Sequence, residues 1–182
     1  MDNEDIKIFA AEAAAAHHAG ELDSLAAQTE ALRESGNLDA AKRLGRELAA
    51  LAAQSPELQG ISQSFGFTLT PAREQQLHVL MVFSGQHALL SQLPELLAEA
   101  AVTAMNNYLI NREKAFWDTI SDGRAFTQYL LAAPMRSDPQ AETVGGAFAR
   151  MCGQEDNPDL RRLGATVFDT AAELVKTRRE EF

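Results

Sequence analysis

The sequence is poor in cysteine and in positive charge. Cys152 is the only cysteine in 182 residues, which excludes a scaffold of intrachain disulfides and a zinc site built from cysteines. The 16 Lys and Arg are outnumbered by 26 Asp and Glu, giving a formal charge of -10. Nucleic-acid binding depends on Lys and Arg that neutralise phosphates. Because no segment has a basic surplus, we expect no nucleic-acid partner.

Long apolar runs are missing too. Residues 75–94 carry no charged side chain, but half of them are polar or break helices. A membrane-spanning helix needs about 20 mostly apolar residues. Three of the first five residues are acidic and none is basic, whereas a secretory or transit peptide would be basic here. We therefore expect a soluble protein with no membrane partner, and a lone thiol fits the reducing cytoplasm.

What the sequence has is apolar residues, 46% of the total, at helical spacing. Near the N-terminus the spacing of three and four residues marks amphipathic helices. Gly36 suits a left-handed helix end and Asn37 a helix start, so the helices on either side should fold back as an antiparallel hairpin. The apolar stripes are Ile6, Phe9, Ala13 and His17, then Leu22, Leu25, Thr29 and Leu32, then Ala41, Leu44, Leu48 and Leu51.

Prolines 56, 71, 94 and 158 mark the starts of further helices, because proline fits the first helical position. Together with the helical spacing of apolar residues, these prolines predict helices over 71–92 and 94–120 and a last one after Asn157. The same spacing predicts helices near 124–132 and 140–152. The fold class is all-α: an irregular helical bundle of about seven or eight helices with an N-terminal antiparallel helical hairpin. We expect a single domain over 1–182, with a subdivision into a 1–55 hairpin and a 56–182 core.

Motifs of common enzymes and cofactor sites are absent. The sequence has no GxxxxGK[ST] or GxGxxG phosphate loop and no GxSxG nucleophile elbow. Gly145 and Gly146 lie inside an apolar helical pattern, where they favour close contact between helices. Cys152 is the last residue of that predicted helix, a place that disfavours a thiolate and favours packing. We therefore predict no catalytic residue and no cofactor.

Four side chains are weak candidates for a metal site. Glu74 and His78 are spaced i, i+4, as are Glu95 and Glu99. Such spacing places both groups of a pair on one helix face, and di-iron bundles use related pairs. The second Glu/His pair of such a site is missing, and Glu74 suits the positive end of a helix dipole. Surface and capping roles are therefore the preferred interpretation, with no metal.

The segment from Met105 to Trp117 holds a candidate ligand or partner surface, formed by Tyr108, Asn111, Arg112 and Trp117. Tyrosine, tryptophan, asparagine and arginine together are typical of ligand grooves and interface hot spots. The alternative interpretation is that Phe116 and Trp117 pack in the core while the asparagines end or bend the helix.

These observations favour a non-enzymatic helical interaction or adaptor protein that works through homo- or hetero-oligomeric helix surfaces. One alternative is a small-ligand-binding domain with an apolar pocket between the 71–92 and 94–120 helices. Another is a metal-dependent helical enzyme. The sequence identifies no particular ligand, substrate or partner.

Overall fold

The computed structural model describes residues 23–53, 56–66, 68–121, 123–133, 140–180 and 182. Throughout these ranges the regular structure is helical and no strand occurs, which confirms the all-α class. The chain divides into two compact units, Met1–Asp39 and Ala40–Phe182.

In the first unit, residues 23–34 form a helix that ends at Ser35 and Gly36. Gly36 has a φ of 80°, the left-handed conformation that the sequence predicts for it, and α2 (Asn37–Ala53) begins directly after it. The earlier stripe from Ile6 to His17 lies outside the described residues. The antiparallel arrangement of the hairpin stays a prediction.

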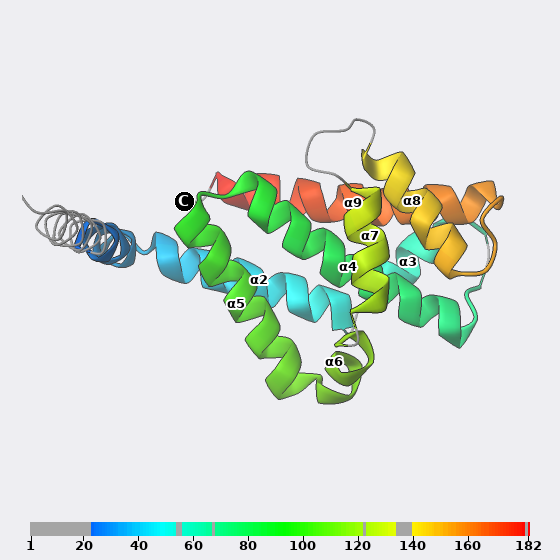
Figure 1. Cartoon of the computed structure of the whole chain (residues 1–182), viewed down its shortest axis with the longest axis horizontal. Coiled ribbons are helices and arrows are strands. Elements are labelled where there is room, and N and C mark those ends of the chain that lie inside the picture. The colour runs from blue at the N-terminus through cyan, green and yellow to red at the C-terminus, as the bar shows by residue number, and fades with distance from the viewer. Residues whose placement is uncertain (1–22, 54–55, 67, 122, 134–139, 181) are drawn as a thin grey trace, which may run out of the picture. The chain divides into compact units, whose positions relative to one another are not determined.

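Seven helices follow α2 in the described part of the chain (Figure 1). Three of them start at a predicted proline, and the Asn157 side chain accepts hydrogen bonds from the backbone N–H groups of Asp159 and Leu160, as an N-cap should. The seven are α3 (Pro56–Ser64), α4 (Pro71–Gln92), α5 (Glu95–Arg112), α6 (Lys114–Ile120), α7 (Arg124–Ala132), α8 (Gln140–Met151) and α9 (Pro158–Arg179).

Helix α4 is the centre of the second unit. Residues 79–85 are buried on every side of the helix, and α4 packs against α5, α7, α8 and α9. Figure 1 shows α9 running alongside α8, the pair with the most extensive contact. The most completely buried helix segment of the second unit therefore lies within residues 75–94, which carry no charged side chain.

The predicted helix over 94–120 is wrong as a single element. It is interrupted at Glu113, whose φ of -127° and ψ of 44° are not helical, so that α5 ends at Arg112 and α6 begins at Lys114. Two residues before the break, the Asn111 side chain donates to the backbone carbonyl of Asn107 at 2.7 Å. Such side-chain bonds to the backbone compete with helical hydrogen bonding.

Candidate functional site

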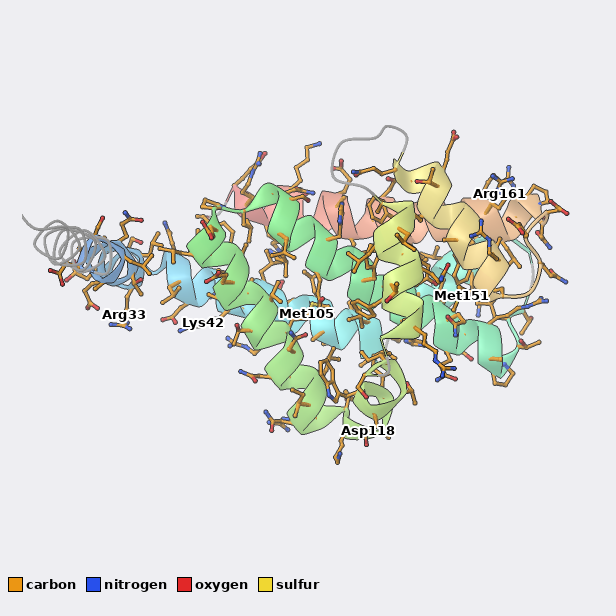
Figure 2. All side chains as sticks on the ribbon, in the orientation of Figure 1. Arg33, Lys42, Met105, Asp118, Met151 and Arg161 are labelled. Atoms are coloured by element: carbon orange, nitrogen blue, oxygen red, sulfur yellow. The ribbon has the colours of Figure 1, made fainter. Side chains whose placement is uncertain are left out.

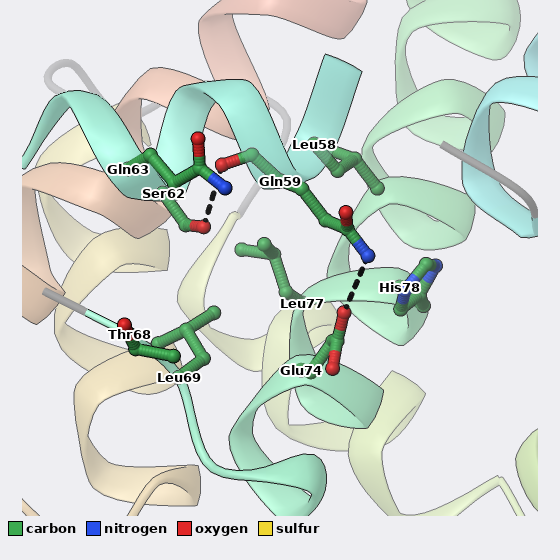
Figure 3. Close-up of a pocket in the computed structure, with 9 residues that line it drawn as sticks. All are labelled: Leu58, Gln59, Ser62, Gln63, Thr68, Leu69, Glu74, Leu77 and His78. Atoms are coloured by element: carbon green, nitrogen blue, oxygen red, sulfur yellow. Dashed lines mark hydrogen bonds between the residues drawn. The ribbon is translucent and has the colours of Figure 1, made fainter. Parts of the chain in front are cut away.

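A cavity of about 240 Å³ opens between α3, the start of α4 and the loop that joins them (Figure 3). Its walls combine three leucines with six polar side chains. The lining residues are Leu58, Gln59, Ser62, Gln63, Thr68, Leu69, Glu74, Leu77 and His78.

The local sequence explains how this cavity forms. Gly66, with a φ of 75°, allows the turn that ends α3, and Thr70-Pro71 then starts α4. Thr70 has the extended backbone of an N-cap residue, although its hydroxyl makes no capping hydrogen bond. Leu58 and Leu77 are both 1% exposed and form the buried apolar part of the wall.

Hydrogen bonds fix several of the polar groups. The Gln59 side-chain amide donates to Glu74 Oε1 at 3.0 Å and so joins α3 to α4 across the cavity (Figure 3). The hydroxyl of the buried Ser62 donates to the Gln59 carbonyl at 2.8 Å. His78 Nδ1 lies in a short hydrogen bond with the carbonyl oxygen of Ala52. Because a carbonyl only accepts, Nδ1 carries the hydrogen, and a neutral His78 has its acceptor at Nε2.

Two of the four metal candidates come together here. Glu74 and His78 line the same cavity, whereas Glu95 and Glu99 are exposed on α5 and are not part of its wall. Within the ranges that the structure describes, no group of three or more His, Cys, Asp or Glu side chains is placed to hold a metal ion.

The candidate surface on α5 and α6 is spread over the break at Glu113. Asn111 and Arg112 are exposed, whereas Tyr108 and Trp117 are half-buried. Nearby, Lys114 and Asp118 form an exposed ion pair at 3.1 Å on α6, where Figure 2 labels Asp118.

The place predicted for an apolar pocket, between α4 and α5, is closely packed at Gly85. A Cβ added to Gly85 would lie 3.2 Å from Cε of the buried Met105, which is labelled in Figure 2. The Gln86 side chain also donates to Asn106 Oδ1 at 2.8 Å, which joins the two helices. Side chains therefore fill the space between α4 and α5 at this level.

Sequence reasoning missed an aromatic cluster around His87. The His87 ring stacks on Phe83, with centroids 5.8 Å apart, and lies 5.3 Å from the Phe168 ring of α9. Burial lowers the pKa of His87, and a hydrogen bond with the Gln140 side chain opposes this effect. Of these partners only Phe83 has a local sequence signal, its i, i+4 spacing from His87. Phe168 and Gln140 are too far along the chain to have one.

Two titratable groups near this cluster, the buried Tyr129 hydroxyl and the half-buried Cys152 thiol, have raised pKa values. The Tyr129 ring lies 5.3 Å from Phe83, and burial, followed by the nearby Cys152, raises the pKa of its hydroxyl. Burial raises the pKa of the Cys152 thiol to about 11, although the nearby Arg73 acts in the opposite direction. Since the thiolate is the nucleophilic form, Cys152 is poorly suited to covalent catalysis at neutral pH.

Protein-family models, curated proteins and solved structures were compared with this chain. None of them matches it. Among the described residues, no helix has both the length and the apolar character needed to cross a membrane.

Proposed function

We propose that this chain is a non-enzymatic cytoplasmic protein that works by association, and that the helix of residues 23–34 pairs with the same helix of a second copy. The supporting observation is that the apolar stripe of this helix is not fully buried in the part of the chain that the structure describes. Leu25 is 46% exposed, and Thr29 and Leu32 are half-exposed. Helices in proteins gain most of their stability by packing an apolar face.

The matching stripe on α2 shows what a covered face looks like in this chain. Ala41, Leu44 and Leu48 have the same spacing and are at most 3% exposed. On α2 this spacing therefore marks a buried helix face. The stripe at Leu25 and Leu32 has the same spacing, but no described residue buries it fully.

A second copy suits this stripe because the stripe is self-complementary. Steps of three, four and three residues place Leu22, Leu25, Thr29 and Leu32 along one seam, as in a short coiled coil. In an antiparallel two-fold pairing, the stripe of one copy meets the same stripe of the other. The helix dipoles also oppose each other favourably in that arrangement.

Light scattering coupled to gel filtration tests the proposal. We expect the full chain at about 100 µM, near the weak end of specific protein affinities, to have twice the chain mass of 19.8 kDa. The double variant Leu25→Glu/Leu32→Glu should be a monomer, because it places charge in the seam. Leu90→Glu, on an α4 side chain that is 52% exposed, is the matched control and should leave the dimer intact.

A monomeric full chain, or a double variant that stays dimeric, would overturn the proposal. A monomer that instead bound a different protein would be an adaptor of the hetero-oligomeric kind.

The small-ligand alternative is supported by one observation, the cavity between α3 and α4. That cavity is not at the place predicted from the sequence. The metal-enzyme alternative has weaker support, because Glu74 and His78 alone provide two ligands of the three or four that a protein metal site needs.

A further inference from the structure

We propose that the cavity between α3 and α4 is a binding site for a small aliphatic amine, taken up as its ammonium ion. The inference goes beyond the association proposed above and does not depend on it, because the lining residues all lie between Leu58 and His78.

The charge of the lining points to a cationic ligand. Among the residues that the structure describes, Glu74 is the only acidic side chain of the wall, and no lysine or arginine lines the cavity. The Glu74 carboxylate therefore has one oxygen held by Gln59 and faces the cavity without a cation that belongs to its wall.

The hydrogen-bonding groups favour a donor in the same way. An ammonium group donates up to three hydrogen bonds and accepts none. The lining offers it acceptors in the Glu74 carboxylate, in the side-chain carbonyl of Gln63 and in the Ser62 hydroxyl, whose own hydrogen is already donated to the Gln59 carbonyl. A carboxylate ligand would meet the charge of Glu74 at close range and is disfavoured.

The apolar wall and the volume set the rest of the ligand. The half-buried Leu69 provides the leucine surface that an aliphatic chain would cover, whereas Leu58 and Leu77 are each only 1% exposed. Taking roughly 30 Å³ for each atom of water size, about 240 Å³ holds about eight non-hydrogen atoms. An amine with a chain of four to six carbons, roughly, matches both the volume and the position of the carboxylate beside the leucines.

The test is a titration of the full chain with n-hexylammonium chloride, followed by amide NMR. We expect saturable binding with a Kd near or below about 1 mM, a range that a ligand of this size can reach. The side-chain amide signals of Gln59 and Gln63 should shift, because both groups line the cavity. Under the same conditions n-hexanol and hexanoate should bind at least about tenfold more weakly, since neither supplies a positive charge.

Two variants complete the design. Glu74→Gln should weaken n-hexylammonium about tenfold or more, whereas Glu95→Gln should not, although Glu95 is likewise in the first turn of its helix. Leu69→Trp should abolish binding by filling the cavity while leaving the carboxylate in place, which keeps the proposal testable even when Glu74→Gln fails to fold.

The proposal is overturned by any of three results: no saturable binding of the ammonium ion, equal binding of n-hexanol, or unchanged binding by Glu74→Gln. None of these three binding results tests the proposed dimer, which is tested separately by the measured mass.

Discussion

At the scale of single residues, three glycines determine how closely the helices approach each other. A Cβ added to Gly45 of α2 would lie 2.0 Å from the backbone oxygen of Ala101 in α5, and one added to Gly145 would lie 2.1 Å from that of Arg161. At Gly164 the added atom would be 2.8 Å from Cβ of Phe148. Contacts this short involve backbone or Cβ atoms, which cannot turn aside, so these crossings require glycine.

The substitution Gly45→Ala tests this requirement. We expect it to lower the free energy of unfolding by about 3 kcal/mol, because α2 and α5 must separate to admit the methyl group. Gly60→Ala is the matched control, since the added Cβ in α3 meets nothing within 4 Å. It should raise stability by about 0.5–1 kcal/mol through helix propensity. Urea denaturation followed by circular dichroism measures both, and equal effects would contradict the role of Gly45.

The sequence predicts some of these residues and not others. Gly145 is predicted as a contact glycine because apolar residues surround it, and the structure confirms the close approach to α9. Gly45 has no such signal, because the residue it meets, Ala101, is far along the chain. Of the candidate site, Glu74 and His78 are predicted as neighbours on one helix face, but the hydrogen-bond partner of Glu74, Gln59, comes from α3. Contacts between helices depend on packing that a single sequence does not specify.

At the scale of elements, helix starts are easier to predict than helix ends. Proline and asparagine act locally, so the starts of α3, α4 and α9 follow from Pro56, Pro71 and Asn157. The break at Glu113 has no proline or glycine, and its only local signal is the three nearby asparagines. That signal also fits a ligand surface, which is why the sequence leaves both interpretations open.

The stability of the folded chain should depend on pH because of His87, which lies on α4. Unfolded histidine titrates near its ordinary pKa of 6.5, whereas burial lowers the pKa of His87 in the folded chain. Between the two pKa values the unfolded state binds more protons. The free energy of unfolding should therefore fall as the pH drops below about 6.5 and level off once folded His87 is protonated.

Urea denaturation at pH 7.5, 6.5 and 5.5 measures this effect, with His87→Phe as the comparison. The variant keeps a ring between Phe83 and Phe168 but does not titrate, so its stability should depend less on pH in this range. Acidic residues titrate alike in both proteins and cancel in the difference. Identical pH profiles would show that His87 is protonated as readily in the folded chain as in the unfolded one.

At the scale of the whole molecule, the two units differ in how their helices are stabilised. In Ala40–Phe182, each of the longer helices has a buried face, and α4 is buried all round along much of its length. In the helix of residues 23–34, no described side chain is buried. Local opening is easiest where few apolar contacts are made, so this helix should open more readily than any in the second unit.

Limited proteolysis tests both the easier opening of the helix of residues 23–34 and the proposed dimer. Arg33 is exposed, and its ion pair with Glu30 is on the surface, so trypsin should cut the monomer there first. Pairing of two copies would protect the bond by mass action. We expect slow cleavage at about 100 µM and fast cleavage at about 0.1 µM, with Leu25→Glu/Leu32→Glu cut fast at both concentrations.

Mass spectrometry of the first fragment locates the cut. A first cut within α4–α9, or a rate at Arg33 that does not depend on concentration, would show that the helix of residues 23–34 is not what joins two copies.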